Sequence, residues 1–469
     1  MDLPTPRQWE PLSAIPIVAG LCWLLPDGGF GWTLWSLLPG GLLLSTGIAL
    51  LLYPGDARIS AYMAAAAVLG LLLWIPAWIA GGFFSATLAA LGSLASLLAA
   101  GRAALTREPV SLGVPPPEMG PLMDLKVGVD EALLGYFVGG ARMPGGEQAL
   151  QMCRQAQQMV DAFKARGWDR DPTGMHPAPP PPPRSFVEKA RFLSHDYEVL
   201  RFDSGFSPDD ALPGASLWKS YTRNNQCHVR LLRHPGPPRP WLLCIHGYRM
   251  GLPFMDLSLF GPRWLHERLG LNIIQPVLPL HGPRRIGART GDFYLDGDPL
   301  DLVYAQAQAL WDLRRTLAWL RQTEGNPRVG VLGYSLGGYN AALLAGYERE
   351  LDFAVAIIPV LDFPSALMRF LPPAYLRFFS QHGLDEQRYR DILGVVSPAT
   401  IPALLPRERL HIVAAVGDRI VLPDHPLALA RHWNVPVTWY QGSHLSIRYE
   451  REPHQVLRHA MGQADWPVG

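Results

Sequence analysis

The chain has 469 residues, which is room for two or three domains and a large core. Its 41 Lys and Arg balance 40 Asp and Glu, and the net charge of +1 excludes the basic excess typical of nucleic-acid-binding proteins. The four cysteines contain no Cys-x-x-C pair, which excludes a zinc ribbon and a thioredoxin-like site, and their spacing does not indicate a disulfide framework. They are Cys22, Cys153, Cys227 and Cys244.

The first hundred residues are strongly apolar. Between Glu10 and Arg102 the only charged side chains are those of Asp27, Asp56 and Arg58. This stretch contains apolar blocks at about residues 11–25, 32–53, 61–80 and 83–100. The last three approach the ~20 residues needed to cross a bilayer, and the first is shorter. We therefore expect residues 1–105 to form a membrane region of about four transmembrane helices.

The basic residues that flank these blocks predict an orientation. With four spans, the N-terminus, the second loop and the C-terminal flank share one side, and they carry Arg7, Arg58, Arg102 and Arg107. The other two loops carry no Lys or Arg. The positive-inside rule then puts both ends of the chain, and everything after the blocks, on the cytoplasmic side. Since no ionisable residue falls inside the blocks, we expect an anchor rather than a transporter or channel.

Residues 106–195 are expected to connect this region to a second domain. The proline runs 115–117 and 179–183 are typical of extended, semi-rigid segments. Between them, residues 147–166 have the apolar periodicity of a helix, and Gly167 follows as a stop signal.

From about residue 196 to the end, strand-like apolar runs alternate with helical patterns. The expected strands cover residues 197–202, 228–232, 241–245, 271–276, 329–332, 354–360, 411–416 and 435–440. The expected helices cover residues 301–321, 424–433 and 454–462. Continuous apolar strands alternating with helices predict an α/β domain with a mostly parallel sheet covered on both faces. Functional residues of such sheets lie at the C-terminal ends of the strands.

A Gly-x-Ser-x-Gly pattern follows one of these strands directly. The strand 329–332 leads into Gly333, Ser335 and Gly337, and a helix of small residues comes next. Glycines on both sides of the serine let the strand and the helix approach closely around a sharp turn. The turn also aims the amide of Leu336 at an oxyanion that forms near the serine. The pattern predicts a nucleophilic serine, and the bland alternative is a structural turn.

Four further strand ends carry side chains or amides suited to such a serine. His-Gly-Tyr248 follows the strand 241–245, so the Tyr248 amide is a second candidate oxyanion donor. Asp418 and His444 follow the next-to-last and last strands, and they are the expected acid and base. Asp362, after the strand 354–360, is an alternative acid. The chain order Ser, Asp, His predicts a nucleophile activated by a histidine.

These motifs resemble the α/β-hydrolase superfamily over residues 227–460. The resemblance rests on the His-Gly after a core strand, the Gly-x-Ser-x-Gly turn, Gly-Asp-x-x-Val around Asp418 and Gly-Ser-His ending at His444. It implies an α/β-hydrolase fold, a triad of Ser335, His444 and Asp418, and no metal or organic cofactor. The chain also resembles the hydrolase domain-containing 18 group, whose members are similar to lipid deacylases.

Two further features bear on the substrate. Arg284 and Arg285 follow the strand 271–276 and are candidates for holding a phosphate or carboxylate, with a solvated basic loop as the alternative. Residues 363–405 fall between two strands where a hydrolase of this type has a lid, and they are rich in Leu and Phe. Such a lid beside a membrane anchor suits a hydrophobic acyl chain.

The sequence therefore predicts a membrane-anchored serine hydrolase with domains at 1–105, 106–195 and 196–469. The expected reaction is cleavage of a carboxylic ester or thioester, with a lipid or another small-molecule ester as the substrate. A serine peptidase of the same fold and a non-catalytic membrane scaffold are the alternatives. No nucleic-acid partner is expected, and the oligomeric state is not readable from the sequence.

Overall fold

The computed structural model describes residues 10–26, 28–108 and 110–467, and the chain divides into two compact units. The first unit consists of Met1–Ala141, Ala415–Asp424 and Trp439–Glu450, and the second of Arg142–Ala414, His425–Thr438 and Arg451–Gly469. Arg7 and Asp27, two of the charges that enter the topology prediction, lie outside the described residues.

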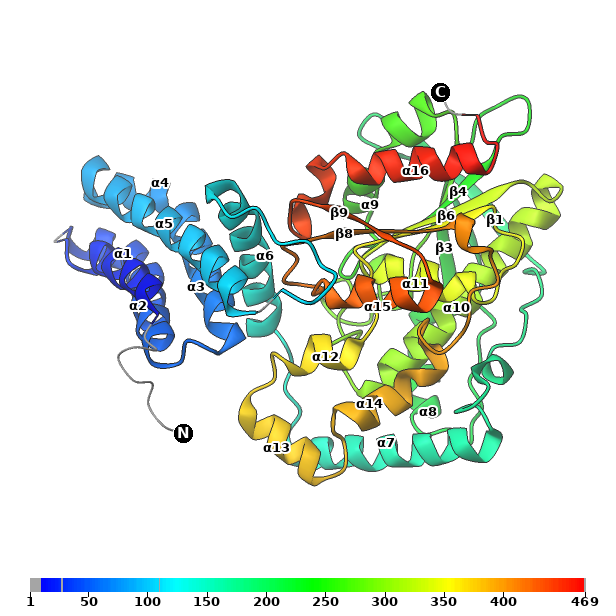
Figure 1. Ribbon diagram of the computed structural model, residues 1–469, viewed down its shortest axis with the longest axis horizontal. Helices are drawn as coiled ribbons and strands as arrows, with labels where there is room; N and C mark the ends of the chain where they lie inside the picture. Colours follow the sequence, from blue (N-terminus) through cyan, green and yellow to red (C-terminus); the bar gives the residue numbers. More distant parts are fainter. Residues whose placement is uncertain (1–9, 27, 109, 468–469) are drawn as a thin grey trace. The chain divides into compact units, whose positions relative to one another are not determined.

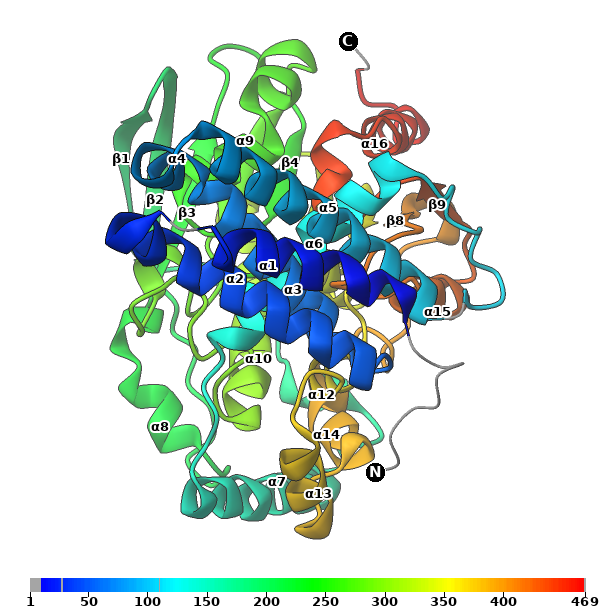
Figure 2. The ribbon, with the colours of Figure 1, turned by 90° about the vertical axis from the view of Figure 1, so that its left-hand side faces the viewer.

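The first unit is a helical bundle (Figures 1 and 2). Its helices are α1 (Ala14–Leu24), α2 (Gly29–Leu52), α3 (Ala57–Leu72), α4 (Trp74–Gly81), α5 (Phe83–Arg107) and α6 (Pro121–Gly139), with short turns η2 (Pro11–Ser13) and η9 (Leu445–Tyr449). Helix α1 packs against α2 and α5, and Figure 2 shows these three side by side. Buried Trp23 stacks on Trp32 and donates its indole N–H to Ser93, so large aromatic side chains fill the centre of the bundle.

Two of these helices, α2 and α5, are long and apolar enough to cross a membrane by length and composition. Helices α3 and α4 pass the same test only as a pair bent by 53°. Helix α1 has 11 residues, so it is about 16 Å long, short of the ~30 Å hydrocarbon core. In place of the four expected spans, the described residues thus contain two helices that could cross a membrane, or three if the bent pair is one span.

Helix α6 was not expected from the sequence, and it extends the first unit beyond residues 1–105. It packs against α3 and α5. Arg102 of α5 forms a two-pronged ion pair with Asp124 of α6, with distances of 2.7 and 2.8 Å. Ser60 of α3 donates to Glu131 of α6. Charged groups on an otherwise apolar helix are therefore satisfied inside the bundle.

The second unit is built on a nine-stranded sheet in the order β1-β2-β3-β5-β4-β6-β7-β8-β9. The strands β5, β4, β6, β7 and β8 are parallel, whereas β1, β2, β3 and β5 pair antiparallel. The bounds are Ser185–Phe192 (β1), His195–Asp203 (β2), Gln226–Leu232 (β3), Trp241–Ile245 (β4), Asn272–Pro276 (β5), Val329–Tyr334 (β6), Phe353–Ile357 (β7), Leu410–Ala415 (β8) and Val437–Tyr440 (β9). Every residue of β4, β5 and β7 is buried, as expected for parallel strands covered on both faces.

Helices cover the sheet of the second unit, with α9 and α16 on one face and α10 and α11 on the other (Figure 1). The bounds are Gly146–Arg166 (α7), Ala215–Ser220 (α8), Pro253–Phe260 (α9), Pro299–Glu324 (α10), Leu336–Ala345 (α11), Phe363–Met368 (α12), Pro373–Gln381 (α13), Glu386–Leu393 (α14), Asp424–Trp433 (α15) and Glu452–Gln463 (α16). Short helical turns lie at Pro172–Met175, Thr222–Asn225, Arg263–Arg268, Gly282–Arg284, Gly394–Val396 and Arg407–Arg409.

The expected α/β architecture is confirmed, and several elements agree to the residue. Strand β4 and helix α15 have the predicted bounds. Strand β1 was missed because it is exposed along most of its length and shows no alternation of apolar and polar side chains. Helices α12 to α14 fill the insertion at residues 363–405, and a lid role for this insertion stays a prediction.

Candidate active site

The serine of the Gly-x-Ser-x-Gly pattern lies on a strained turn between β6 and α11. Ser335 has φ 57° and ψ −114°, a conformation that L-residues adopt only when the surrounding structure enforces it. A Cβ on Gly333 would stand 1.9 Å from the Gly337 carbonyl oxygen, and a Cβ on Gly337 would stand 1.9 Å from the Ile245 carbonyl oxygen. Only glycine fits at both positions, so the close approach predicted from the sequence is confirmed.

The loop after β4 lies next to this serine within the second unit. A Cβ on Gly247 would be 3.7 Å from the Ser335 Cβ and 3.5 Å from the Tyr334 carbonyl oxygen. Tyr248 follows directly, and Leu336 is the first residue of α11. The two segments that carry the candidate oxyanion donors therefore both adjoin the serine, while the role of the two amides stays a proposal.

A buried histidine fixes the loop that carries Tyr248. His246 Nδ1 lies 2.8 Å from the Gly247 carbonyl oxygen, and its Nε2 accepts the Leu278 amide at 3.0 Å. Burial lowers the pKa of His246 to about 3, so its ring is neutral near pH 7. The ring of buried His281 lies edge-on at 5.1 Å and makes its own bond to the Pro279 carbonyl. Both imidazoles hold backbone in place.

The structure contradicts a substrate-binding role for Arg284. Its side chain is fully buried and donates to the Val277 and Asn224 carbonyls, at 2.9 and 2.7 Å. It also forms a 2.7 Å ion pair with Asp312. The guanidinium thus binds groups inside the protein, because a buried cation must be paired. Arg285 is half-buried and donates to the Gly282 carbonyl at 3.1 Å, which leaves its ligand-binding role a proposal.

In the first unit, the expected base and acid form a buried pair. His444 Nδ1 lies 2.6 Å from Asp418 Oδ2. The other oxygen of Asp418 accepts the amides of Ile420 and Val421 at 3.0 and 2.8 Å, so the carboxylate is fixed in orientation. With Nδ1–H donated to Asp418, the Nε2 of His444 is the ring atom left to act as a base.

The alternative acid is engaged elsewhere. Asp362 accepts two bonds from Arg390, at 2.9 and 2.7 Å. Its backbone amide donates to His425 at 3.1 Å. Of the two carboxylates considered, Asp418 is therefore the one bound to His444.

A second carboxylate, missed by the sequence, also faces the histidine. Asp130 of α6 is fully buried and accepts the backbone amides of His444 and Leu445, at 2.7 and 3.0 Å. Burial, together with repulsion from Asp418, raises the pKa of Asp130 to about 7. The signal that could have found it is an acidic pair, Asp130 and Glu131, in the middle of an apolar helix, since a buried carboxylate needs a partner.

The protonation of His444 reflects these neighbours. Burial disfavours its charged form, but attraction to Asp418 and then to Asp130 outweighs burial and raises the pKa of His444 above its usual value. Charge that develops on the ring during proton transfer is accordingly stabilised by carboxylates already in place.

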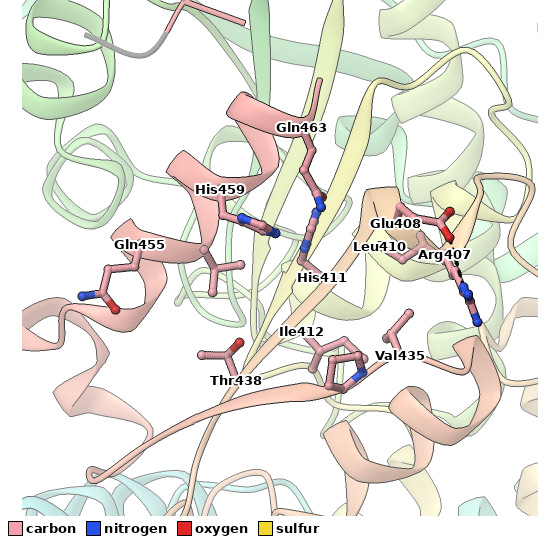
Figure 3. Close-up of a pocket in the computed structure, with 12 residues that line it drawn as sticks. Arg407, Glu408, Leu410, His411, Ile412, Val435, Thr438, Gln455, His459 and Gln463 are labelled. Atoms are coloured by element: carbon pink, nitrogen blue, oxygen red, sulfur yellow. Dashed lines mark hydrogen bonds and ion pairs between the residues drawn. The ribbon is translucent and has the colours of Figure 1, made fainter. Parts of the chain in front are cut away.

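A cavity of about 380 Å³ lies elsewhere in the second unit, between α16 and the starts of β8 and β9 (Figure 3). His411 and His459 line it with their rings 5.8 Å apart, and burial lowers the pKa of His411 to about 4. None of the predicted site residues lines this cavity. Within the described part of the chain, no three His, Cys, Asp or Glu side chains are grouped so that they could hold a metal ion.

Comparisons with known proteins give one clear relationship. No protein-family model matches the chain. An uncharacterized protein of Mycobacterium tuberculosis, Rv2627c in strain H37Rv, is 38% identical over 307 residues, which cover 65% of this chain and 73% of that protein. The uncharacterized protein MT2702 of strain CDC 1551 matches with the same identity and coverage.

Similar solved structures are more distant. Acetyl xylan esterase from Paenibacillus sp. R4 has 16% identity and a TM-score of 0.42, over 66% of this chain and 93% of that chain. Acetyl xylan esterase 1 from Thermoanaerobacterium sp. JW/SL YS485 has 13% identity and a TM-score of 0.42, over 62% of this chain and 96% of that chain. Acylaminoacyl peptidase of Pyrococcus horikoshii has 13% identity and a TM-score of 0.35, over 60% of this chain and 41% of that chain. Likeness at this level says nothing about the reaction or the substrate.

The strand order and the strained serine between β6 and α11 are those of the α/β-hydrolase fold, as the sequence motifs predicted. The chain belongs to the same family as the two uncharacterized mycobacterial proteins. The resemblance to the hydrolase domain-containing 18 group stays a prediction.

Proposed function

We propose that the protein is a serine hydrolase in which Ser335 is the nucleophile, His444 the general base and Asp418 the residue that orients the histidine. The observation that carries this proposal is the strained turn at Ser335, which has the geometry of a nucleophile elbow. The buried pair of His444 and Asp418 supports it independently, since a histidine held through Nδ1 is ready to accept a proton at Nε2.

In the proposed reaction, Ser335 Oγ attacks the carbonyl carbon of an ester or thioester while His444 Nε2 takes the hydroxyl proton. The oxyanion of the tetrahedral intermediate accepts hydrogen bonds from the amides of Tyr248 and Leu336. As the intermediate collapses, the bond to the leaving alcohol or thiol breaks, and the leaving group takes the proton from His444. A water molecule then attacks the acyl-enzyme with His444 again as the base, which releases the carboxylic acid and restores the serine.

A membrane location and an acyl substrate are parts of the same proposal. Helices α2 and α5 would anchor the chain, with the sheet domain on the cytoplasmic side. The insertion at residues 363–405 would cover the site as a lid, and its exposed apolar side chains include Leu376 and Leu404. An anchored enzyme with an apolar cover suits a lipid or another long-chain ester.

A fluorophosphonate probe tests the proposal on the full chain in detergent micelles. The probe forms a bond to an activated serine, so the native protein is expected to be labelled and the Ser335→Ala variant is not. Ser220→Ala, at an exposed serine at the end of α8, is the matched control and should label like the native chain. Folded native protein that takes no label would favour a non-catalytic scaffold.

The substrate class is tested on the same preparations. Acyl esters, acyl thioesters and peptide amides with equal acyl chains are compared, with Ser335→Ala as the blank. Faster release from esters or thioesters than from amides supports the proposal, whereas activity confined to amides would assign a peptidase. A rate that rises with acyl chain length supports a lipid substrate, and a rate that falls assigns a small ester.

A further inference from the structure

The loop that carries His444 is held at both ends by one helix of the same unit. We call residues 441–450 the histidine loop. Lys126 of α6 donates to the Gln441 carbonyl at 2.9 Å and pairs with the Glu450 carboxylate at 2.7 Å. The side-chain amide of Gln441 is in turn held by the backbone of the proline-rich segment, at the Glu118 amide and the Pro116 carbonyl. The ends of the histidine loop are thus fixed by residues outside the sheet domain.

The centre of the histidine loop rests on Asp130, one turn further along α6. One oxygen of Asp130 accepts the His444 amide, and the other accepts the Leu445 amide and lies 3.0 Å from the Ser443 hydroxyl. Lys126 and Asp130 are four residues apart, so both face the same side of the helix. The buried carboxylate therefore satisfies two consecutive backbone amides, and without it these donors would have no partner of equal strength.

Helix α6 is itself locked to the bundle. Arg102 pairs with Asp124, and Glu131, the neighbour of Asp130, binds Ser60, which also accepts a bond from Arg107 at 2.8 Å. A Cβ on Gly128 would meet the Leu97 carbonyl oxygen at 2.5 Å, so the backbones of α5 and α6 nearly touch. Polar bonds and close packing thus connect the helices that could span a membrane to the residue that holds the histidine loop.

We propose that Asp130 is a positioning residue for His444 and that α6 makes catalysis depend on the helical bundle. The inference rests on the proposed function, because it assigns to Asp130 the task of holding the base of that reaction. Asp130 fixes the backbone of His444 while Asp418 fixes its ring, so the imidazole is held from two sides. Positioning of this kind matters because small displacements of a base cost large factors in rate.

The charged groups near the histidine loop determine how Asp130→Asn should change the pKa of His444. His444 faces Asp418 and Asp130, while Lys126 and Glu450 neutralise each other at the ends of the loop. Asp130→Asn removes one negative charge and sets an amide N–H against a backbone N–H. It should therefore displace the loop and lower the pKa of His444.

The experiment measures the rate of fluorophosphonate labelling of the full chain between about pH 5 and about pH 9. Asp130→Asn is expected to label at least about tenfold more slowly at its best pH. The acid limb of its pH profile, where the labelling rate falls as the pH drops, should move to lower pH by about one unit. Asp124→Asn is the matched control, since it removes a carboxylate of α6 that binds Arg102 and not the histidine loop. Its acid limb should stay where it is in the native protein.

A second variant serves if Asp130→Asn does not fold. Ser443→Ala removes one of the three groups that Asp130 holds and keeps the charge, so labelling should slow by about threefold with an unmoved acid limb. The inference would be overturned if folded Asp130→Asn were labelled at the native rate with the acid limb of the pH profile unmoved. An unchanged labelling rate in Ser443→Ala would overturn it as well. Either result would leave the proposed function standing. No labelling of the native chain would instead reject the proposed function.

Discussion

The serine turn and the histidine loop are built on opposite principles. The turn is held by its neighbours: Gly333 and Gly337 meet each other, and Gly337 meets the end of β4. The histidine loop is held by a residue 314 positions earlier in the chain, Asp130, through polar bonds. The first arrangement follows from local steric fit, and the second from a helix that the sheet domain does not contain.

This difference has consequences for what each region tolerates. A steric turn fails when volume is added, because backbone atoms at van der Waals distance cannot yield. A buried polar loop fails when a partner is removed, because the orphaned donors keep the full cost of leaving water. Substitutions that add volume should therefore damage the serine turn, and substitutions that keep volume but remove charge should damage the histidine loop.

The largest effect is expected for Asp418→Asn, which keeps the volume of the side chain. An amide at this position favours the wrong tautomer of His444, with the proton on Nε2, so the ring could not accept a proton from the serine. Labelling by the fluorophosphonate probe should fall by about four orders of magnitude while the thermal unfolding temperature changes little.

Asp362→Asn is the control for this prediction. The carboxylate of Asp362 is half-exposed and pairs with half-exposed Arg390, and such pairs contribute about 1 kcal/mol or less. Its labelling rate should stay within about twofold of the native rate. A loss in Asp362→Asn equal to that in Asp418→Asn would reassign the acid.

Much of the serine side was predictable, because its determinants lie close together in the sequence. Apolar runs predict β4 and β6, and the glycines around Ser335 predict a tight turn. No residue other than glycine fits at Gly333 and Gly337. Chain order then gives Asp418 and His444 at strand ends. The apolar helices were predicted less well, since apolar length alone does not reveal the 53° bend between α3 and α4.

The histidine side was only partly predictable, because a long-range polar partner leaves no periodic signal. Asp130 is one carboxylate in a helix whose other side chains read as a mixed connecting segment. Arg284 was misjudged for the same reason: its partner Asp312 lies in α10, 28 residues away. The sequence shows which residue types follow each strand, whereas tertiary packing decides which of them are buried and with which residues they pair.

The second largest effect tests whether the serine side also depends on a distant polar anchor. Arg284→Met keeps much of the side-chain volume and leaves the carboxylate of Asp312 without its cation. The free energy of unfolding should fall by about 3–5 kcal/mol, measured by chemical denaturation. The labelling rate of the protein that remains folded should stay within about threefold, because the guanidinium contacts only internal groups.

Arg285→Met is the matched control, since Arg285 is the half-buried neighbour with one bond to a carbonyl. Its stability should change by less than about 1 kcal/mol. A loss of labelling in folded Arg284→Met, with stability unchanged, would return Arg284 to the list of ligand-binding residues.

Added volume at the serine turn should have the next effect. Gly337→Ala places a Cβ where the Ile245 carbonyl oxygen now stands, so β4 and α11 must separate. We expect a loss of about 2–3 kcal/mol in the free energy of unfolding, together with slower labelling, because the turn that presents Ser335 is distorted. Gly394→Ala, where a Cβ would meet open space on a helical backbone, should leave both unchanged.

The smallest expected effect concerns pH and salt. His444 is a base only when neutral, so labelling must fall as the pH drops through its pKa. Burial alone would lower that pKa, but Asp418 and Asp130 raise it, so the acid limb should have its midpoint above 6.5.

Raising the ionic strength from about 0.1 M to about 1 M shortens the Debye length from about 10 to about 3 Å, yet the midpoint should move by less than about 0.2 units. Both carboxylates are buried, so counter-ions do not reach them. A midpoint below 6.5 would mean that burial outweighs the carboxylates, and a midpoint that moved strongly with salt would mean that the histidine loop is open to solvent.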